Sequence, residues 1–340
     1  MEAADFFVAA CLAEGFALAG VTPCGPPPRA ELLQSWLDAD MHGSMAWMAR
    51  NTHLRADPSG LLEGVRSIIC VADRYEPPGP EEGQIAAYAK GRDYHKIMKR
   101  RLHRLCDAWK TRWPDATFRS CVDTAPIMER AHAEAAGLGR VGKNTLLIET
   151  GVGSWCLLGE VLTTLDISPT PAAAEDPCGT CTRCIDACPT DALTPWHLDA
   201  RRCIAALTIE DRGVISDEFH EDIGGWMFGC DVCQQVCPHN QPTERSGAVA
   251  AGEAYAPRLH GFEILEVLQW TEADRVRRLQ GTPMTRATRD MWRRNACIAA
   301  GERPGDAQIR RVIDEIASSS DEPEIVRAAA LATQARFSEA

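Results

Sequence analysis

The spacing of its cysteines constrains this chain more than any other feature. Eight of the fifteen cysteines lie between Cys178 and Cys237. The first four follow the pattern C-x2-C-x2-C-x3-C-P, which is the bacterial ferredoxin run that holds 4Fe–4S clusters. Such close spacing lets one tight turn direct three thiolates at a single cluster. The region is therefore expected to fold around a metal cluster, and electrons are expected to pass through the protein.

The next four cysteines after this run are expected to complete the ligands of two clusters. After the first run come a lone Cys203 and then C-x2-C-x3-C-P, which lacks the leading cysteine of the motif. In two-cluster ferredoxins the fourth cysteine of a run binds the other cluster, and Cys203 can replace the missing ligand. We therefore predict two interlocked clusters. The first is bound by Cys178, Cys181, Cys184 and Cys237, and the second by Cys188, Cys203, Cys230 and Cys233.

Structural zinc and disulfide bonds are two other uses of clustered cysteines. Zinc also takes four thiolates, but zinc ribbons usually pair two C-x2-C knuckles, without a third cysteine or a following proline. Disulfide frameworks suit short secreted chains, whereas this chain has 340 residues. Its segment before Ala17 contains acids and no basic n-region, so it predicts an amphipathic helix and not a signal peptide. The spacing favours iron–sulfur clusters.

Composition limits the class of protein. With 340 residues, 45% of them hydrophobic, the chain can form two or three domains with substantial cores. No apolar run approaches the roughly 18 residues that a membrane-spanning helix requires. We therefore expect a cytoplasmic monomer with reduced thiols and no membrane contact. The net charge of −12 argues against nonspecific nucleic-acid binding, which needs many cationic contacts.

One segment of this acidic chain is strongly basic. From Asp93 to Trp113 apolar residues recur at helical spacing, which predicts an amphipathic helix. Its buried face is expected to contain Met98, Leu102, Leu105 and Trp109. The opposite face would carry Lys96, Lys99, Arg100, Arg101, Arg104, Lys110 and Arg112. Such a face is usually only solvated, and contact with a nucleic-acid backbone is the alternative.

Patterns along the chain predict an α/β domain, then a ferredoxin-like domain with two clusters, then a helical region. The predicted boundaries are 1–168, 169–245 and 246–340. The apolar runs at 67–72 and 155–162 predict strands covered on both faces. Residues 169–177, rich in proline and alanine, predict a linker into the cluster domain.

The C-terminal region is predicted to be helical. Helical spacing joins Ile309, Val312, Ile313 and Ile316. Asp321-x-x-Glu324 has the form of a capping box before a helix over 325–337. Paired helices over 293–337 are consistent with one HEAT-type unit, and equally with a plain helical cap.

Asp123 is the carboxylate that its position singles out. It follows a short predicted strand over 117–122 and precedes a helix predicted to open at Pro126 and end near Gly137. In that place it could cap the start of the helix. It could also face a flat apolar cofactor, where burial would raise its pKa and let it donate a proton.

Two cofactor motifs fail on inspection. The stretch 137–142 has G-x-G-x-x-G spacing, but it follows a helix and not a strand, which excludes a dinucleotide-binding interpretation. Asp93-x-His95 resembles the opening of the D-x-H-x-x-G motif that supplies a histidine to cobalamin, but Met98 replaces the glycine. We therefore assign His95 to packing or to the surface, and expect no histidine ligand if a corrin binds.

Together these features resemble the epoxyqueuosine reductase family, cobalamin-dependent iron–sulfur enzymes that complete queuosine synthesis in tRNA. The resemblance covers most of the chain, and its specificity comes from the stretch ending in Gly142-Lys143-Asn144 joined to the eight-cysteine layout. It rests on His42-Gly43-Ser44-Met45, Arg55-x-x-Pro58, Gly91-Arg92-Asp93-Tyr94-His95, Val122-Asp123-Thr124-Ala125-Pro126, Glu129-Arg130, the stretch 136–144, Asp199-Ala200-Arg201-Arg202-Cys203-Ile204 and Phe228-Gly229-Cys230-Asp231-Val232-Cys233-Gln234.

The resemblance implies a specific activity. Epoxyqueuosine at the wobble position of a tRNA anticodon would be reduced to queuosine, and its epoxide oxygen would leave as water. Base-off cobalamin in the α/β domain would carry out the reduction, fed by the two clusters from a low-potential donor of flavodoxin or ferredoxin type. The resemblance makes Asp123 the proton donor and Arg55 a corrin contact. It also makes Leu147 and Leu158 residues that line the corrin.

The chain departs from the family pattern at two places. Gly225-Trp226-Met227-Phe228 occupies a region where an Asn-Arg pair is common. Ala86-Ala87 stands where some members have a cysteine. Roles that depend on that arginine or on that cysteine are therefore not transferred to this chain.

Two other functions compete with this interpretation. A reductive dehalogenase-like enzyme would share cobalamin and both clusters, but such proteins generally carry an export signal and use a tyrosine-type proton donor. A noncatalytic electron-transfer protein would explain the cysteines, but it would leave the α/β region without a use.

Overall fold

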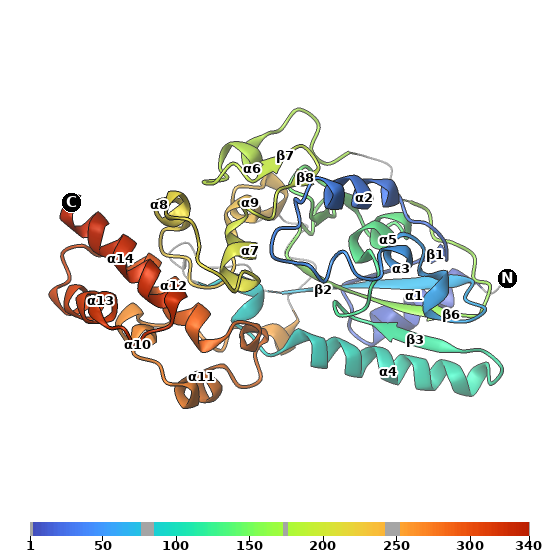
Figure 1. Ribbon diagram of the computed structural model, residues 1–340. Helices are drawn as coiled ribbons and strands as arrows, with labels where there is room; N and C mark the ends of the chain where they lie inside the picture. The colour runs from blue at the N-terminus through green and yellow to red at the C-terminus, as the bar shows by residue number, and fades with distance from the viewer. Residues whose placement is uncertain (1–2, 76–84, 173–175, 242–251, 340) are drawn as a thin grey trace.

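The computed structural model describes residues 3–75, 85–172, 176–241 and 252–339. Figure 1 shows a four-stranded sheet flanked by helices, a group of α-helices at the C-terminal end, and the cysteine-rich segment between them. The centre of the predicted linker (173–175) and the predicted domain boundary at 245 lie outside the described residues. Within the described ranges, no helix is long and apolar enough to cross a membrane.

Four strands form the sheet, and every neighbouring pair is antiparallel. In spatial order they are β1 (Leu18–Pro23), β2 (Ser67–Arg74), β6 (Cys156–Thr163) and β3 (Phe118–Cys121). β2 and β6 are the two strands that the apolar runs predict, and β2 is buried along almost its whole length. The prediction of strands covered on both faces is confirmed. β3 is shorter than predicted at both ends.

Helices cover the two faces of the sheet (Figure 1). α1 (Ala4–Ala13) and α4 (Tyr94–Arg112) pack on the face that contains Ile69. α5 (Glu129–Ala135) packs on the opposite face, with Ile68. The two apolar clusters separate because successive side chains of a strand point to opposite faces. The α5 face is the one on which the candidate catalytic residues gather.

α4 forms as its periodicity predicts. The Asp93 side chain accepts a hydrogen bond from the backbone N–H of His95 (3.2 Å) and so caps the helix. Its buried residues are Met98, Leu102, Leu105 and Trp109, as predicted. The helix ends at Arg112, two residues before Pro114, because a proline disfavours helical backbone in the residue before it. The predicted basic residues lie on the outer side except Arg101, which is only 12% exposed because its guanidinium pairs with the buried Asp73 beneath the helix; its prediction for the outer face is wrong.

The helix after Asp123 begins later than predicted. α5 starts at Glu129, with Met128 at the N-cap and no side-chain cap, and not at Pro126. Asp123 therefore does not cap it, which corrects one of the two roles considered for this residue. The helix ends as predicted before Gly137, whose φ of 81° lies in the left-handed region that glycine adopts without strain.

The cysteine-rich segment contains only short elements. α6 (Arg183–Asp186), α7 (Ile204–Ile209) and α9 (Val232–Gln235) alternate with loops that carry the cysteines. A hairpin of β7 (Leu193–Thr194) and β8 (His197–Leu198) connects the first two helices. With so little regular structure, this segment depends on its ligands and on its neighbours for rigidity.

The C-terminal region is helical, as predicted. Its helices include α10 (Ile264–Leu268), α11 (Glu272–Leu279), α12 (Arg289–Ala300), α13 (Ala307–Ser318) and α14 (Glu324–Glu339). The four predicted apolar residues of α13 are all buried. The predicted capping box is wrong. α14 begins at Glu324 itself, and the carbonyl of Pro323 accepts the N–H groups of Val326 and Arg327.

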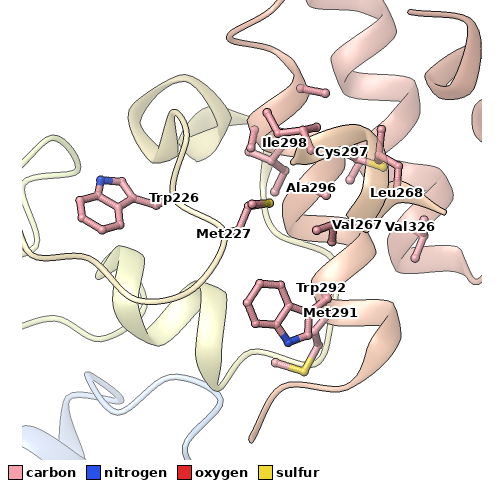
Figure 2. Packing of buried hydrophobic residues seen from close by; sticks show 14 of the residues in the cluster. Trp226, Met227, Val267, Leu268, Met291, Trp292, Ala296, Cys297, Ile298 and Val326 are labelled. Atoms are coloured by element: carbon pink, nitrogen blue, oxygen red, sulfur yellow. The ribbon is translucent and has the colours of Figure 1, made fainter. Parts of the chain in front are cut away.

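One apolar core joins the cysteine-rich segment to the C-terminal helices. Figure 2 shows Met227 beside α12, close to Ala296 and Cys297. The rings of Phe228 and Trp292 are stacked, with centroids 5.5 Å apart. The departure from the family pattern at 225–228 therefore places Trp226, Met227 and Phe228 in this core, where all three are buried.

Candidate catalytic and cluster-binding site

Asp123 lies in a turn just beyond β3. Its φ of 54° is in the left-handed region, which is uncommon for residues other than glycine, although Asp and Asn tolerate it best. Its side chain is about half exposed (53%). Strained backbone of this kind occurs most often at functional sites. The turn leaves the carboxylate half exposed and within hydrogen-bond distance of His95.

His95 joins Asp123 to a second carboxylate. Its Nε2 lies 2.9 Å from Oδ2 of Asp123, and its Nδ1 lies 2.8 Å from Oδ1 of Asp93. A neutral imidazole has only one N–H, so both contacts are hydrogen bonds only if the ring is protonated or one carboxyl keeps its proton. Burial lowers the pKa of His95, but the hydrogen bonds to Asp123 and Asp93 outweigh it, and the net effect is a raised pKa.

Two further acids lie behind Asp123. Glu129, the first residue of α5, accepts the backbone N–H of Asp123 at 2.5 Å. Burial, followed by repulsion from Asp123, raises the pKa of Glu129 to about 7. Glu160 in β6 is fully buried, and both its carboxyl oxygens are without hydrogen-bond partners in the part of the chain described. Burial, with repulsion from Glu129 and Asp123, raises its pKa well above the ordinary value. Asp123 is therefore backed by groups that hold protons near neutral pH.

Arg55 belongs to α3 (Thr52–Ala56), and its guanidinium lies over the ring of Trp47, 5.4 Å from the centroid. Burial lowers the pKa of Arg55, while Glu129 and Asp123 act in the opposite direction. The structure therefore brings Arg55 into the electrostatic neighbourhood of the same carboxylates.

The two predicted corrin-lining leucines lie on the α5 face. Leu147 in β5 (Leu147–Ile148) is buried there, and Leu158 in β6 packs against the same apolar cluster. β5 pairs with β4 (Arg140–Val141), which directly follows the glycine-rich turn after α5. The structure thus places both leucines in one apolar packing group, which also contains Cys121 at the end of β3.

Several buried polar atoms near this face have no hydrogen-bond partner among the described residues. They are Nδ1 of His42, Nε1 of Trp47, Nε of Arg55, Nε2 of His132, Nδ2 of Asn144 and both carboxyl oxygens of Glu160. Most buried polar groups in proteins are paired, so such a concentration is typical of a site completed by a ligand. Apolar leucines beside unpaired donors fit a corrin, whose ring edge is apolar and whose side chains end in amides.

The eight cysteines form two sets of mutual neighbours. Charges on Cys178, Cys237 and Cys181 each raise the pKa of the Cys184 thiol, after the larger effect of burial. Burial raises the pKa of Cys230 to about 12, and Cys203 and Cys188 add to the shift. Among the thiols, Cys230 and Cys203 raise the pKa of Cys233 most, after burial, and Cys184 of the first set adds a smaller effect. These neighbours are those of the predicted crossed arrangement, although the assignment of ligands to iron stays a prediction.

No group of three His, Cys, Asp or Glu side chains in the described ranges is placed to hold a single metal ion. The thiols of a cubane bind four different iron atoms, so they need not converge on one point.

The second departure from the family pattern also has a structural role. The N–H of Ala86 donates to the carbonyl of Phe228 (2.8 Å), and that of Ala87 donates to the buried Asp231 carboxylate (2.7 Å). A Cβ added to Gly229 would lie 2.5 Å from Cβ of Ala86. Small residues are needed here because the strand-like segment from Ile85 packs directly on the backbone of the second cysteine motif.

The basic face of α4 is only partly free. Lys96, Lys99, Arg100, His103, Arg104 and Asp107 line a shallow groove. Arg101, in contrast, is bound to the buried Asp73 beneath the helix, and Arg104 is bound to Glu14. Lys96 is 74% exposed, directly follows His95 in the chain, and its Nζ lies 3.7 Å from Oδ2 of Asp93. The groove therefore starts beside the Asp123 site and runs along the helix.

Sequence reasoning missed three residues of this site. His95 was assigned to packing or the surface, but it bridges Asp93 and Asp123. Glu129 belongs to the Glu129-Arg130 pair on which the resemblance partly rests, but no role was predicted for it. Glu160 did give a signal, since it is an acid inside an otherwise apolar strand. The acids near Glu160, which are Glu129 and Asp123, could not be identified from the sequence because they lie in other elements of the fold.

Two family models match parts of this chain, and two bacterial relatives resemble it over most of its length. A family model described as "4Fe-4S double cluster binding domain" matches residues 177–240, and one described as "Epoxyqueuosine reductase QueG, DUF1730" matches residues 55–124. The epoxyqueuosine reductase of Xanthomonas campestris pv. campestris is 38% identical over 88% of this chain and 87% of its own length. That of Escherichia coli K12 is also 38% identical, over 88% of this chain and 81% of its own length.

Solved structures agree with these matches. An epoxyqueuosine reductase crystallised with an epoxyqueuosine-modified tRNA-Tyr stem loop superposes with a TM-score of 0.87 at 26% identity, covering 98% of this chain and 89% of that one. The Streptococcus thermophilus enzyme gives 0.85 at 26% identity, covering 98% and 97%. A Bacillus subtilis structure, described with its catalytic aspartate loop swung out of the active site, gives 0.84 at 25% identity, covering 98% and 90%.

Proposed function

This chain belongs to the epoxyqueuosine reductase family, and from that premise we propose that it reduces epoxyqueuosine to queuosine at the wobble position of tRNA. The observation that carries the proposal is 38% identity over 88% of the chain, which includes both the Asp123 region and the cluster domain. The reaction consumes two electrons and two protons. It breaks both C–O bonds of the epoxide, forms the alkene and releases the oxygen as water.

The cluster domain would supply the electrons. Two 4Fe–4S clusters are supported by the double-cluster family model over residues 177–240. The crossed ligand sets are supported by the two groups of neighbouring thiols. A low-potential flavodoxin- or ferredoxin-type donor would deliver electrons singly, because each cluster carries one at a time.

The α/β domain is proposed to bind cobalamin on its α5 face. When bound, cobalamin would supply a strongly reducing, nucleophilic metal centre. Arg55, Leu147 and Leu158 would hold the corrin, and the unpaired donors around α3 and α5 would bind its amide groups. Base-off binding without a histidine ligand is supported by His95, whose two ring nitrogens already face carboxylates.

Asp123 would donate the proton to the epoxide oxygen. Its half-exposed carboxyl is accessible to a substrate, and the bond from its N–H to Glu129 fixes the turn that carries it. His95 would return a proton from its Nε2 to Oδ2 of Asp123, while Asp93 holds the opposite side of the ring. His95, whose side chain is 30% exposed, would take its own proton from solvent, so that Asp123 is reprotonated after each turnover.

The tRNA would lie along the groove on α4. Lys96, Lys99 and Arg100 run outward from the Asp93–His95 pair, so a backbone held there would bring its anticodon loop to Asp123. The wobble base would then leave the loop and enter the site, since specific RNA recognition usually targets unstacked bases. The helices α12 to α14 are proposed to act as a HEAT-like unit that contacts the same tRNA.

Nucleoside analysis of tRNA tests the proposed function. Cells lacking the gene should accumulate epoxyqueuosine, and the gene should restore queuosine. If the queuosine content of tRNA is unchanged in the deletion strain, the proposed function is wrong. Absorbance of the anaerobically purified protein separates the alternative of a noncatalytic electron carrier, which would show the clusters but gain no corrin band on addition of cobalamin.

A further inference from the structure

Lys143 lies where the catalytic domain meets the first cysteine motif. It sits in the turn between β4 and β5 and is only 7% exposed. Its Nζ donates hydrogen bonds to the carbonyls of Gly179 (2.7 Å) and Cys181 (3.0 Å). Both acceptors belong to the tight turn of the first three cysteines. A single side chain therefore spans from one domain to the backbone that would hold a cluster.

The backbone of the same residue reaches a ligand sulfur directly. The N–H of Lys143 donates to Sγ of Cys178 at 3.3 Å. A Cβ on the neighbouring Gly142 would lie 3.2 Å from that sulfur and 2.4 Å from Cδ1 of Ile148, so a side chain there would require its neighbours to shift. Close approach of the backbone and burial of the ammonium thus occur at one place in the chain.

The ammonium of Lys143 has no acidic partner in the described residues, since none of the ion pairs found within 4.0 Å includes it. The centroid of the Trp196 ring lies 5.7 Å from Nζ, and the backbone N–H of Trp196 donates to the Lys143 carbonyl (3.1 Å). A buried cation is costly unless a negative charge lies nearby. Four thiolates and a cubane carry such a charge, and it becomes more negative when the cluster is reduced.

We propose that Lys143 is a redox-tuning residue, which raises the reduction potential of the cluster bound through Cys178 and Cys181 relative to that of the second cluster. The proposal rests on the two clusters of the proposed function. The added electron is stabilised by the ammonium and by the N–H bond to the sulfur, because net charge and hydrogen bonds to sulfur set the potentials of such clusters. Lys143 also positions the cysteine turn against the catalytic domain.

The test is a potentiometric titration, followed by electron paramagnetic resonance, of the cluster-loaded enzyme without cobalamin. Lys143→Met keeps the length of the side chain and removes its charge and donors. Lys143→Arg keeps the charge. We expect one of the two midpoint potentials to become more negative in Lys143→Met and the other to stay unchanged. Lys143→Arg should leave both close to those of the original protein.

Lys110→Met is the matched control, because Lys110 also donates to a backbone carbonyl, that of Ala116, but at the far end of α4. It should move neither potential. The proposal is overturned if Lys143→Met keeps full iron and sulfide content with both potentials unchanged. It is also overturned if Lys143→Met and Lys143→Arg lose the same cluster, since Lys143 would then be only a structural clamp. Two resolved cluster signals in the original protein establish the premise independently of any assay on tRNA.

Discussion

At the scale of single residues, the position of Asp123 is fixed by three different parts of the chain. β3 ends two residues before it, Glu129 of α5 accepts its N–H, and His95 of α4 contacts its carboxylate. The backbone strain at φ 54° persists because these contacts together determine the turn. These contacts limit the conformations of the turn, as the proposed role of Asp123 as a proton donor would require.

Replacing Asp123 by Asn should remove turnover. Asn tolerates the left-handed backbone and keeps the size of the side chain, but it cannot donate an acidic proton. We expect the rate of queuosine formation to fall about 100-fold or more, the usual contribution of a general acid. Iron, sulfide and bound cobalamin should be unchanged. Activity within a few-fold of the original would show that the proton comes from another group.

His95 should make stability depend on pH in a defined direction. Its folded-state pKa is raised by Asp123 and Asp93 against the effect of burial, so the folded state favours the protonated ring. The stabilisation is full below the ordinary histidine pKa of about 6.5 and is lost as pH rises through the raised value. Denaturant unfolding of His95→Gln should therefore show its largest deficit near pH 5.5 and a smaller one near pH 8.5. A deficit that does not vary with pH would contradict the pairing.

In contrast to His95, Glu160 should reduce the stability of the folded protein, so replacing it should increase the free energy of unfolding. Its pKa is raised by burial, so the folded protein must keep a proton that the unfolded chain releases above about pH 4.5. This cost grows as pH rises towards the folded-state pKa. Glu160→Gln should increase the free energy of unfolding at pH 8 and change it much less at pH 5. Chemical denaturation of the cobalamin-free protein at both values measures the difference, and a larger gain at pH 5 would exclude the protonated state.

At the scale of elements, α4 combines two functions on opposite faces. One face is the apolar wall of the sheet domain, and the other carries the groove that begins at the catalytic residues. Its N-cap, Asp93, is also the residue that fixes His95. The start of the helix is thereby tied to Asp123 through His95, so a shift of α4 would alter both the groove and the surroundings of the proposed proton donor.

Charge reversal on this helix should weaken tRNA binding. Lys99→Glu with Arg100→Glu removes two cations of the groove that make no ion pair in the described residues, whereas Arg104 is engaged by Glu14. We expect lower affinity and a log–log salt slope smaller by about one unit for each lost contact. Binding titrations from low to moderate salt measure both. Arg66→Glu, a reversal at an exposed residue paired with Asp166, is the control and should leave the slope unchanged.

At the scale of the whole molecule, the cluster segment and the C-terminal helices behave as one body. Asn295 of α12 donates to the carbonyls of Thr208 and Met227, both in the cysteine-rich segment. Arg294 beside it is fully buried and donates to the carbonyl of Leu207. The C-terminal helices thus supply the rigidity that the short elements around the cysteines lack.

Asn295→Ala should destabilise both parts together. It leaves two buried carbonyls without donors, and each such loss costs about 1–3 kcal/mol. Thermal unfolding followed by cluster absorbance and by far-ultraviolet circular dichroism should show both transitions at lower temperature and still coincident. Separate transitions would mean that the two parts unfold independently. Gln334→Ala, at an exposed contact with Asp314, is the control and should have little effect.

Prediction from the sequence succeeded where the signal is local. The cysteine spacing, the amphipathic pattern of α4 and the apolar run of β2 each lie within a short stretch of chain. The fold contains the helix and the strand, and the double-cluster family model matches the cysteine region. Prediction failed at the first residues of two helices, which depend on contacts with other residues of the fold. α5 starts at Glu129, three residues after Pro126, and Glu129 accepts the N–H of Asp123 in the preceding turn. α14 starts at Glu324, without the predicted capping box.

The sequence alone determined the cluster chemistry, the amphipathic helix and, through its resemblance, the family. The tertiary structure decided which side chains meet. His95 and Asp123 are 28 residues apart, Lys143 and Cys178 are 35 apart, and Glu160 lies behind Asp123 only because β6 pairs with β3. Short sequence motifs predict the geometry of residues that are close in the chain, because the local backbone sets that geometry. Contacts between distant residues depend on how the whole chain packs, and no short pattern records that packing.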